Sequence, residues 1–182
     1  AHSVGMHCNR MDIAQAIVDV LGDNILSVYY KSETTLPYKA QADNSTGYII
    51  GGHLNDVPLE YGLKLPVDWN KKKKTGLFID QRENRALLEK YSNGRSVLNM
   101  FCYTGGFSLA ALRGGAKLVH SVDSSAKATE LTIKGVKDNF PDDDRHKAFA
   151  EDAFKFLDNM KEKYDLIILD PPAFAKHRDE LK

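Results

Sequence analysis

The sequence predicts an α/β fold in which a parallel β-sheet is covered by helices on both faces and is preceded by a small α+β domain. From residue 71 onward, strand-like and helix-like segments alternate as βαβαβαβ, and strands as apolar as Leu166–Leu169 are typical of a sheet buried on both faces. Before residue 70, one helix is followed only by short strands. The 182 residues suffice for one full domain and an appendage. We therefore expect two domains, at 1–70 and 71–182.

The first domain is expected to begin with an amphipathic helix. The apolar residues of Met11–Leu21 recur at helical spacing, and Gly22 stands where a helix C-cap belongs. Polar turns at 41–46 and 55–58 separate the segments that follow, and the second turn is expected to form a hairpin. The predicted strands of this domain lie at 25–30, 47–54 and 59–69.

The second domain is expected to follow the lysine run Lys71–Lys74, which reads either as a solvated connector or as a contact for RNA phosphates. Its elements are assigned from the period of the apolar residues and from the turn residues between them. Predicted helices cover 81–91, 106–113, 126–140 and 153–161, and predicted strands cover 96–101, 118–123, 147–150 and 164–170.

The composition indicates an ordinary soluble protein. Apolar residues make up 42% of the chain and charged residues 27%, and no apolar run is long enough to span a membrane. The 25 basic and 25 acidic residues balance, so net charge does not favour a polyanionic partner. Cys8 and Cys102 are too far apart for a disulfide framework or a zinc site, and the histidines lack metal-ligand spacing. No secretory leader is visible, so we expect a cytoplasmic protein without a metal.

The residues that follow each strand are the candidates for a functional site, because ligands of open parallel sheets bind beyond the carboxyl ends of the strands. After the first of these strands, Gly105 and Gly106 allow a tight turn and bring the backbone close to a ligand at a helix N-terminus. The segment lacks the full Gly-x-Gly-x-x-Gly pattern of dinucleotide-binding folds, which argues against a nicotinamide cofactor. A plain tight turn is the alternative.

Acidic residues follow the next two strands. Asp123 comes 17 positions after Gly106, close to the spacing at which a carboxylate meets ribose hydroxyls. Asp152 is placed to accept the amino group of an adenine, with Ala153 or Phe154 against the ring. Both aspartates could instead cap the helix that follows them.

The last strand runs into Asp170–Phe174, which contains two consecutive prolines. Pro171 and Pro172 lack amide hydrogens and hold the chain in an extended turn. A rigid carboxylate at Asp170 beside the aromatic ring of Phe174 suits a planar base, which Phe174 would stack on and Asp170 would position. The alternative is a proline-stiffened loop that only ends the strand.

Taken together, the strand ends resemble the motifs of class I S-adenosylmethionine-dependent methyltransferases, whose sheet is Rossmann-like. The residues of these motifs are most similar to the bacterial large-subunit (23S) rRNA cytosine-C5 methyltransferase family. The resemblance is to the branch that carries an RNA-binding PUA domain ahead of a central α+β domain. The segments that carry the resemblance are Lys74–Arg85, Val97–Ser108, Ser121–Ser124 and Asp170–Phe174.

The resemblance implies a cofactor site and its parts. Gln81 and Arg82 would meet the methionine carboxylate, Asp123 the ribose and Asp152 the adenine, while the segment around Phe78 would close over the cofactor. Asp170 would help to bind the target base. The residues that the resemblance assigns to the cofactor are Thr75, Phe78, Asp80, Gln81, Arg82, Asn99, Phe101, Tyr103, Thr104, Gly105, Gly106, Phe107, Asp123, Ser124, Asp152, Ala153 and Asp170.

The match to the family is incomplete at both ends. The PUA domain and the three strands that normally follow the fourth have no counterpart among residues 1–182, so we expect the chain to be a piece of a longer protein. The segment 164–170 is then expected at a sheet edge through which two copies could pair. Pyrimidine C5 methylation also needs a thiolate nucleophile. We interpret Cys102 as a packing residue and expect the nucleophilic cysteine beyond residue 182. The 182 residues alone are therefore not expected to methylate RNA.

Three functions remain open on the sequence. The first is methyl transfer to cytosine C5 in 23S rRNA, with S-adenosylmethionine as cofactor and RNA as partner. The second keeps the cofactor and transfers the methyl group to a guanine nitrogen, which needs no cysteine. The third is a binding module that retains the cofactor fold without catalysis.

Overall fold

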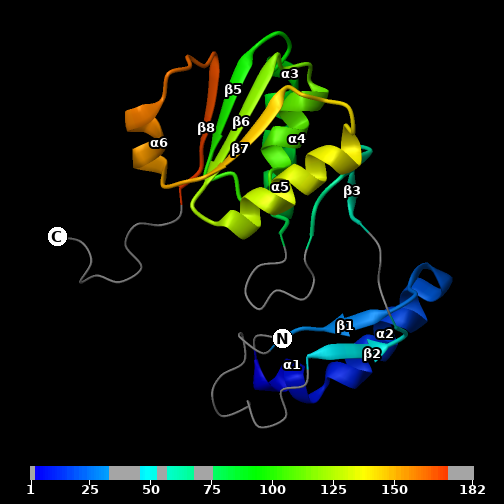
Figure 1. The fold of residues 1–182 in the computed structure, drawn as a ribbon. Coiled ribbons are helices and arrows are strands. Elements are labelled where there is room, and N and C mark those ends of the chain that lie inside the picture. Colours follow the sequence, from blue (N-terminus) through cyan, green and yellow to red (C-terminus); the bar gives the residue numbers. More distant parts are fainter. Residues whose placement is uncertain (1–2, 33–45, 53–56, 68–75, 172–182) are drawn as a thin grey trace, which may run out of the picture. The chain divides into compact units, whose positions relative to one another are not determined.

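The computed structural model describes residues 3–32, 46–52, 57–67 and 76–171, and these form two compact units. The first unit comprises Ala1–Asp56 with Lys71–Lys73, and the second comprises Val57–Asn70 with Lys74–Lys182. Figure 1 shows the elements of both. None of the helices in these ranges is long and apolar enough to cross a membrane.

The described residues of the first unit form two α-helices and a two-stranded antiparallel sheet. Helix α2 (Arg10–Leu21) confirms the predicted amphipathic helix, and its C-cap is Gly22 with a φ of 54°. Helix α1 (Val4–Cys8) was not predicted; the hydroxyl of Ser3 caps it by accepting the Met6 N–H. A short 3₁₀ turn (Gly22–Asn24) leads to β1 (Val28–Tyr30), which pairs with β2 (Gly47–Ile50).

The segment 59–69, predicted as one strand, contains a hairpin instead. Strand β3 (Leu59–Glu60) pairs with β4 (Leu63–Lys64), and the turn between them has positive φ at Tyr61 (48°) and Gly62 (86°). Two successive positive φ values suit a tight hairpin, but tyrosine gives no turn signal in the sequence. Half of the expected hairpin at 55–58 falls outside the described residues, which resume at residue 57.

The hairpin packs within the second unit. The Asn139 side chain accepts the Lys64 N–H at 2.8 Å and donates to the Lys64 carbonyl at 2.8 Å, which ties β4 to helix α5 (Ala126–Asn139). The compact units therefore divide between Asp56 and Val57. The domain boundary near residue 70 stays a prediction.

The second unit is the predicted α/β sheet. Its four strands, β5 (Ser96–Met100), β6 (Leu118–Asp123), β7 (His146–Ala150) and β8 (Leu166–Leu169), are parallel and lie in the order β7-β6-β5-β8. Because the chain crosses from one edge to the other between β7 and β8, the strand order reverses between β5 and β8. A ligand of such a sheet binds at this reversal. The helices are α3 (Arg82–Tyr91, after a 3₁₀ turn at Ile79–Gln81), α4 (Gly106–Arg113), α5 and α6 (Ala153–Asn159).

Alternate residues of the strands face two cores. One face, with Val97 and Val119, packs on α3, α4 and α5 through residues such as Leu88, Leu109 and Val136. The other face, with Leu98, Met100 and Val122, packs on Ala153 and Phe156 of α6. Helices therefore cover both faces, as predicted; among the helices of the described residues, only α6 lies on its side of the sheet in Figure 1.

Strand β8 is an edge strand among the described residues, as expected from the incomplete sheet. Leu166 and Ile168 turn toward the α4 side and are partly buried in its core. Ile167 and Leu169 turn the other way and keep 56% and 65% of their surface exposed. Two of the four apolar side chains of β8 are therefore mostly exposed to solvent.

Candidate functional site

The glycine loop between β5 and α4 has an unusual backbone. Phe101 and Tyr103 have φ values of 56° and 51°, and Gly105 follows at 80°, so every second residue is left-handed. The Gly105 N–H bonds to the Cys102 carbonyl at 2.8 Å, and the Cys102 N–H bonds to the Val122 carbonyl at 2.9 Å. Left-handed non-glycine residues are costly and occur preferentially at functional sites. The loop thus folds tightly against the end of β6.

Gly105 cannot be replaced without strain. A Cβ atom there would lie 2.4 Å from Cγ2 and 2.8 Å from Oγ1 of the buried Thr132. We expect Gly105→Ala to lower the free energy of unfolding by about 2–4 kcal/mol, because left-handed strain adds to overpacking. Gly94→Ala is the control, since Gly94 also has a positive φ but an added Cβ meets nothing within 4 Å. Equal losses in urea unfolding of the two variants would contradict the steric argument.

Asp123 is fixed by two backbone amides. Its Oδ2 accepts the Tyr103 N–H and its Oδ1 accepts the Ser125 N–H, both at 2.9 Å. The N-cap of α5 is Ser125, whose hydroxyl accepts the Ala128 N–H. Capping therefore does not account for Asp123, whose carboxylate is held beside the glycine loop with further acceptor positions available.

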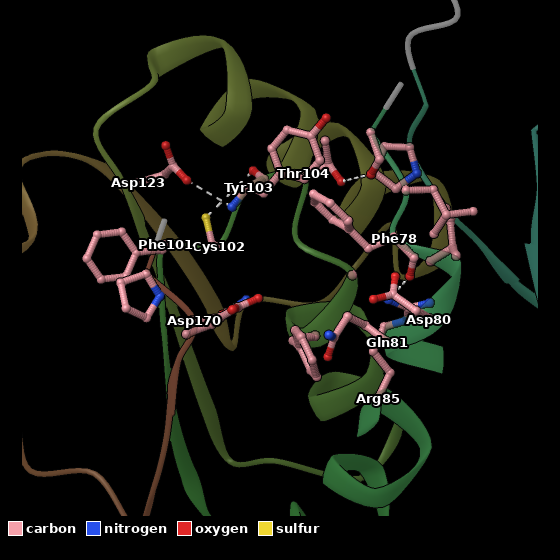
Figure 2. A pocket seen from close by; sticks show the side chains of 18 of the residues that line it. Phe78, Asp80, Gln81, Arg85, Phe101, Cys102, Tyr103, Thr104, Asp123 and Asp170 are labelled. Carbon is pink, nitrogen blue, oxygen red and sulfur yellow. Dashed lines mark hydrogen bonds between the residues drawn. The ribbon is translucent and has the colours of Figure 1, made fainter. Parts of the chain in front are cut away.

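A cavity of about 470 Å³ opens at the carboxyl ends of β5, β6 and β8, within the usual range for ligand sites. In Figure 2, Asp123 and Phe101 lie on one side of it, and Asp80, Gln81 and Arg85 on the other. The predicted site residues that line it are Phe78, Asp80, Gln81, Asn99, Phe101, Tyr103, Thr104, Gly106, Phe107, Asp123, Ser124, Asp170 and Pro171.

Other predicted residues do not line this cavity. The Arg82 side chain is 53% exposed and pairs with Glu83 at 3.5 Å. The Asp152 carboxylate caps α6 by accepting the N–H groups of Phe154 and Lys155, which is the alternative that the sequence left open. The cofactor-binding roles of Arg82 and Asp152 remain predictions. Gly105 and Ala153 are also absent from the lining, and Thr75, Pro172 and Phe174 lie outside the described residues.

The N-terminus of α4 faces the cavity without a side-chain cap. Gly105 is its N-cap and provides no side-chain acceptor, while Gly106 and Phe107 line the cavity. The first amide hydrogens of a helix have no partner within the helix, and they carry the positive end of its dipole. This end of the cavity therefore suits a carboxylate.

The segment before the sheet is anchored to the site by Arg85, which sequence reasoning did not single out. Its guanidinium donates twice to the Glu60 carboxylate, at 2.6 Å each, and once to the Phe78 carbonyl at 3.0 Å. Thr104 donates to the Gly76 carbonyl. Leu65, Pro66 and Leu77 also line the cavity and were missed, because only the tertiary fold brings β4 and its following loop to the strand ends.

Cys102 lines the cavity but is only 6% exposed. Burial, and then the charge of Asp123, raise its pKa to about 12, so at neutral pH it is a thiol and not a nucleophilic thiolate. We expect iodoacetamide at pH 8 to alkylate the exposed Cys8 and spare Cys102 in the folded protein, with both modified after denaturation. Comparable labelling of the two in the folded protein, by mass spectrometry, would contradict the interpretation of Cys102 as a packing residue.

Comparisons with known proteins agree with this geometry. Two proteins named ribosomal RNA large subunit methyltransferase I are similar: that of Tolumonas auensis is 40% identical over 85% of this chain and 41% of its own length, and that of Aeromonas hydrophila is 37% identical over 98% and 46%. The chain thus spans less than half the length of these relatives. The crystal structure of SMU.776, a candidate methyltransferase complexed with SAH, superposes with a TM-score of 0.78 at 30% identity, covering 96% of this chain and 45% of that one.

A family model covers most of the chain. It describes S-adenosylmethionine-dependent methyltransferases and matches residues 27–181, which include the glycine loop, Asp123 and Asp170. The order of the four parallel strands, the cavity at their carboxyl ends and the family match all agree. The chain belongs to the family of S-adenosylmethionine-dependent methyltransferases, with S-adenosylmethionine as its cofactor.

Proposed function

We propose that this chain is the cofactor-binding part of an enzyme that methylates cytosine C5 in large-subunit rRNA. The observation that carries the proposal is the cavity, in which an oriented carboxylate, an uncapped helix N-terminus and Asp170 come together. The names of the two relatives support an rRNA substrate. The motif resemblance supports the cytosine. RNA in the cytoplasm is then the partner.

The residues present fit S-adenosylmethionine. Asp123 has acceptor positions left for two ribose hydroxyls, because each of its oxygens takes only one amide. The N-terminus of α4, with Gln81 nearby on the cavity wall, suits the methionine carboxylate. When bound, the cofactor supplies a methyl group on a sulfonium centre. Phe101 and Phe78 would provide apolar walls for it, since both line the cavity.

The target base is assigned to the end of β8. Asp170 and Pro171 line the cavity, and the carboxylate of Asp170 can accept amino hydrogens of a base. C5 transfer needs a thiolate that adds to the pyrimidine ring. Cys102 does not fit this role because its pKa is raised to about 12. Cys8 is not among the residues that line the cavity, so we place the nucleophile outside residues 1–182.

Guanine N-methylation remains the alternative, since no thiolate lies in the described cavity and nitrogen attack needs none. The test uses the full-length enzyme and rRNA from cells that lack it. Mass spectrometry of the RNA digest is expected to show 5-methylcytidine. A methylated guanosine would establish the alternative. If S-adenosylhomocysteine fails to bind in calorimetry, both proposals fail and the non-catalytic binding module stands.

A further inference from the structure

A row of polar side chains crosses the α4 face of the sheet. Asn99 on β5 donates through Nδ2 to Ser108 Oγ on α4 at 2.9 Å. Ser108 Oγ lies 2.6 Å from Ser121 Oγ on β6, and Ser121 Oγ lies 2.8 Å from His146 Nε2 on β7. Asn99, Ser108 and Ser121 are each at most 1% exposed. The row therefore connects the cavity wall, where Asn99 lies, to the far strand of the sheet.

This row crosses the mainly apolar core on one face of the sheet. Val97, Val119 and Leu109 belong to that core, and all three are fully buried. Buried polar groups cost free energy unless each is hydrogen-bonded. Apolar residues at these positions would therefore stabilise the fold equally well. A complete row that ends at a ligand cavity indicates a role beyond packing.

The hydrogen bonds of the row can all run in one direction. An amide nitrogen can only donate, so Ser108 accepts from Asn99 and can donate its own hydrogen to Ser121. Ser121 can then donate to His146 when the Nε2 atom of His146 carries a lone pair. In this arrangement each hydroxyl accepts once and donates once, and His146 holds its proton on Nδ1.

The direction of the row decides which atom Asn99 offers to the cavity. With Nδ2 bound to Ser108, the carbonyl oxygen is left over, and no described residue donates a hydrogen bond to it. If His146 carried its proton on Nε2 instead, it would donate to Ser121 and would no longer direct the row. Ser108 could then donate to the Asn99 oxygen, which would leave the amide nitrogen for the cavity.

We propose that His146 is a positioning residue which, through Ser121 and Ser108, holds the Asn99 carbonyl oxygen toward the cavity as an acceptor for the ammonium group of an amino-acid moiety. The inference rests on the proposed function, in which that moiety is the methionine part of the cofactor. Burial, and then the charge of His120, lower the pKa of His146 to about 4. It is therefore neutral at pH 7 and able to accept.

The tautomer of His146 tests the direction without any mutation. In ¹⁵N NMR of protein labelled at histidine, we expect His146 to be the neutral Nδ1–H tautomer, assigned by the loss of its signals in His146→Gln. The Nε2–H tautomer would overturn the proposal, because His146 would then donate to Ser121 and could not be the acceptor that directs the row. A purely structural role makes no such demand on the tautomer.

Ligand discrimination tests the consequence. Calorimetry is done with S-adenosylhomocysteine, which has the amino-acid part, and with 5′-methylthioadenosine, which lacks it. We expect Ser121→Ala and His146→Leu to lower the affinity for S-adenosylhomocysteine about 5-fold to 10-fold. The affinity for 5′-methylthioadenosine should not change. His146→Gln, which keeps an acceptor, should recover most of the loss.

A double-mutant cycle assigns the effect to Asn99. If His146 acts through Asn99, then Asn99→Ala combined with His146→Leu binds S-adenosylhomocysteine no more weakly than Asn99→Ala alone. Additive losses, or equal losses for both ligands, overturn the inference and indicate a structural role. If the parent protein binds neither ligand, the cofactor site of the proposed function fails as well. If it binds both and the variants do not discriminate, only the present inference fails.

Discussion

Replacing Asp123 with alanine is expected to weaken S-adenosylhomocysteine binding by about 10-fold to 100-fold, since hydrogen bonds to a charged group contribute about 1.5–3 kcal/mol. The carboxylate accepts the N–H groups of Tyr103 and Ser125 and lines the cavity. Its removal takes away the ribose acceptor and also a support of the left-handed loop. Isothermal titration calorimetry measures the first effect, and urea unfolding measures the second.

Asp165→Ala is the matched control for this prediction. The Asp165 carboxylate also accepts a backbone amide, that of Ser96 at 2.8 Å, and pairs with Lys117 at 3.3 Å. It lies at the amino end of the sheet, opposite the cavity. We expect a loss of stability with unchanged ligand affinity. If both variants lose affinity equally, Asp123 has no direct contact with the ligand.

Replacing Arg85 with leucine is expected to lower the free energy of unfolding by about 3–5 kcal/mol, the usual cost of leaving a buried charge without its partner. The side chains of Arg85 and Glu60 are only 6% and 11% exposed, and the guanidinium also holds the Phe78 carbonyl. Stability and cofactor affinity should fall together, because the segment around Phe78 forms part of the cavity wall. Urea unfolding and calorimetry report the two effects.

Two controls separate the charge from the geometry. Adding Glu60→Leu to Arg85→Leu should recover much of the stability, because no unpaired carboxylate remains, but it should not restore the contact with Phe78. Arg113→Leu breaks a similar pair, in which the side chains of Arg113 and Glu89 are 25% and 29% exposed. This variant should therefore lose less free energy of unfolding. An Arg113→Leu loss as large as that of Arg85→Leu would contradict the role of burial.

The second unit could be predicted from local sequence signals almost element by element. Helix α4 and strand β6 have the predicted bounds, and β5, α5 and β7 differ by one residue at one end. Here local signals agree with the final fold, because apolar periodicity, caps and glycines all specify the same elements. The glycine loop, Asp123 and Asp170 were likewise found from their positions after strands, since parallel strands bring their carboxyl ends to one edge.

Which residues these elements bring together could be seen only in the folded structure. The hairpin at Tyr61–Gly62 carries no turn signal at the tyrosine, and its assignment to the second unit depends on contacts such as that between Lys64 and Asn139. The pairing of Arg85 with Glu60 joins residues far apart in the sequence, and so does the row from Asn99 to His146. The tertiary structure also distinguished caps from cavity residues, because an aspartate after a strand can serve in either role. Such choices depend on burial and on long-range partners, which local sequence does not encode.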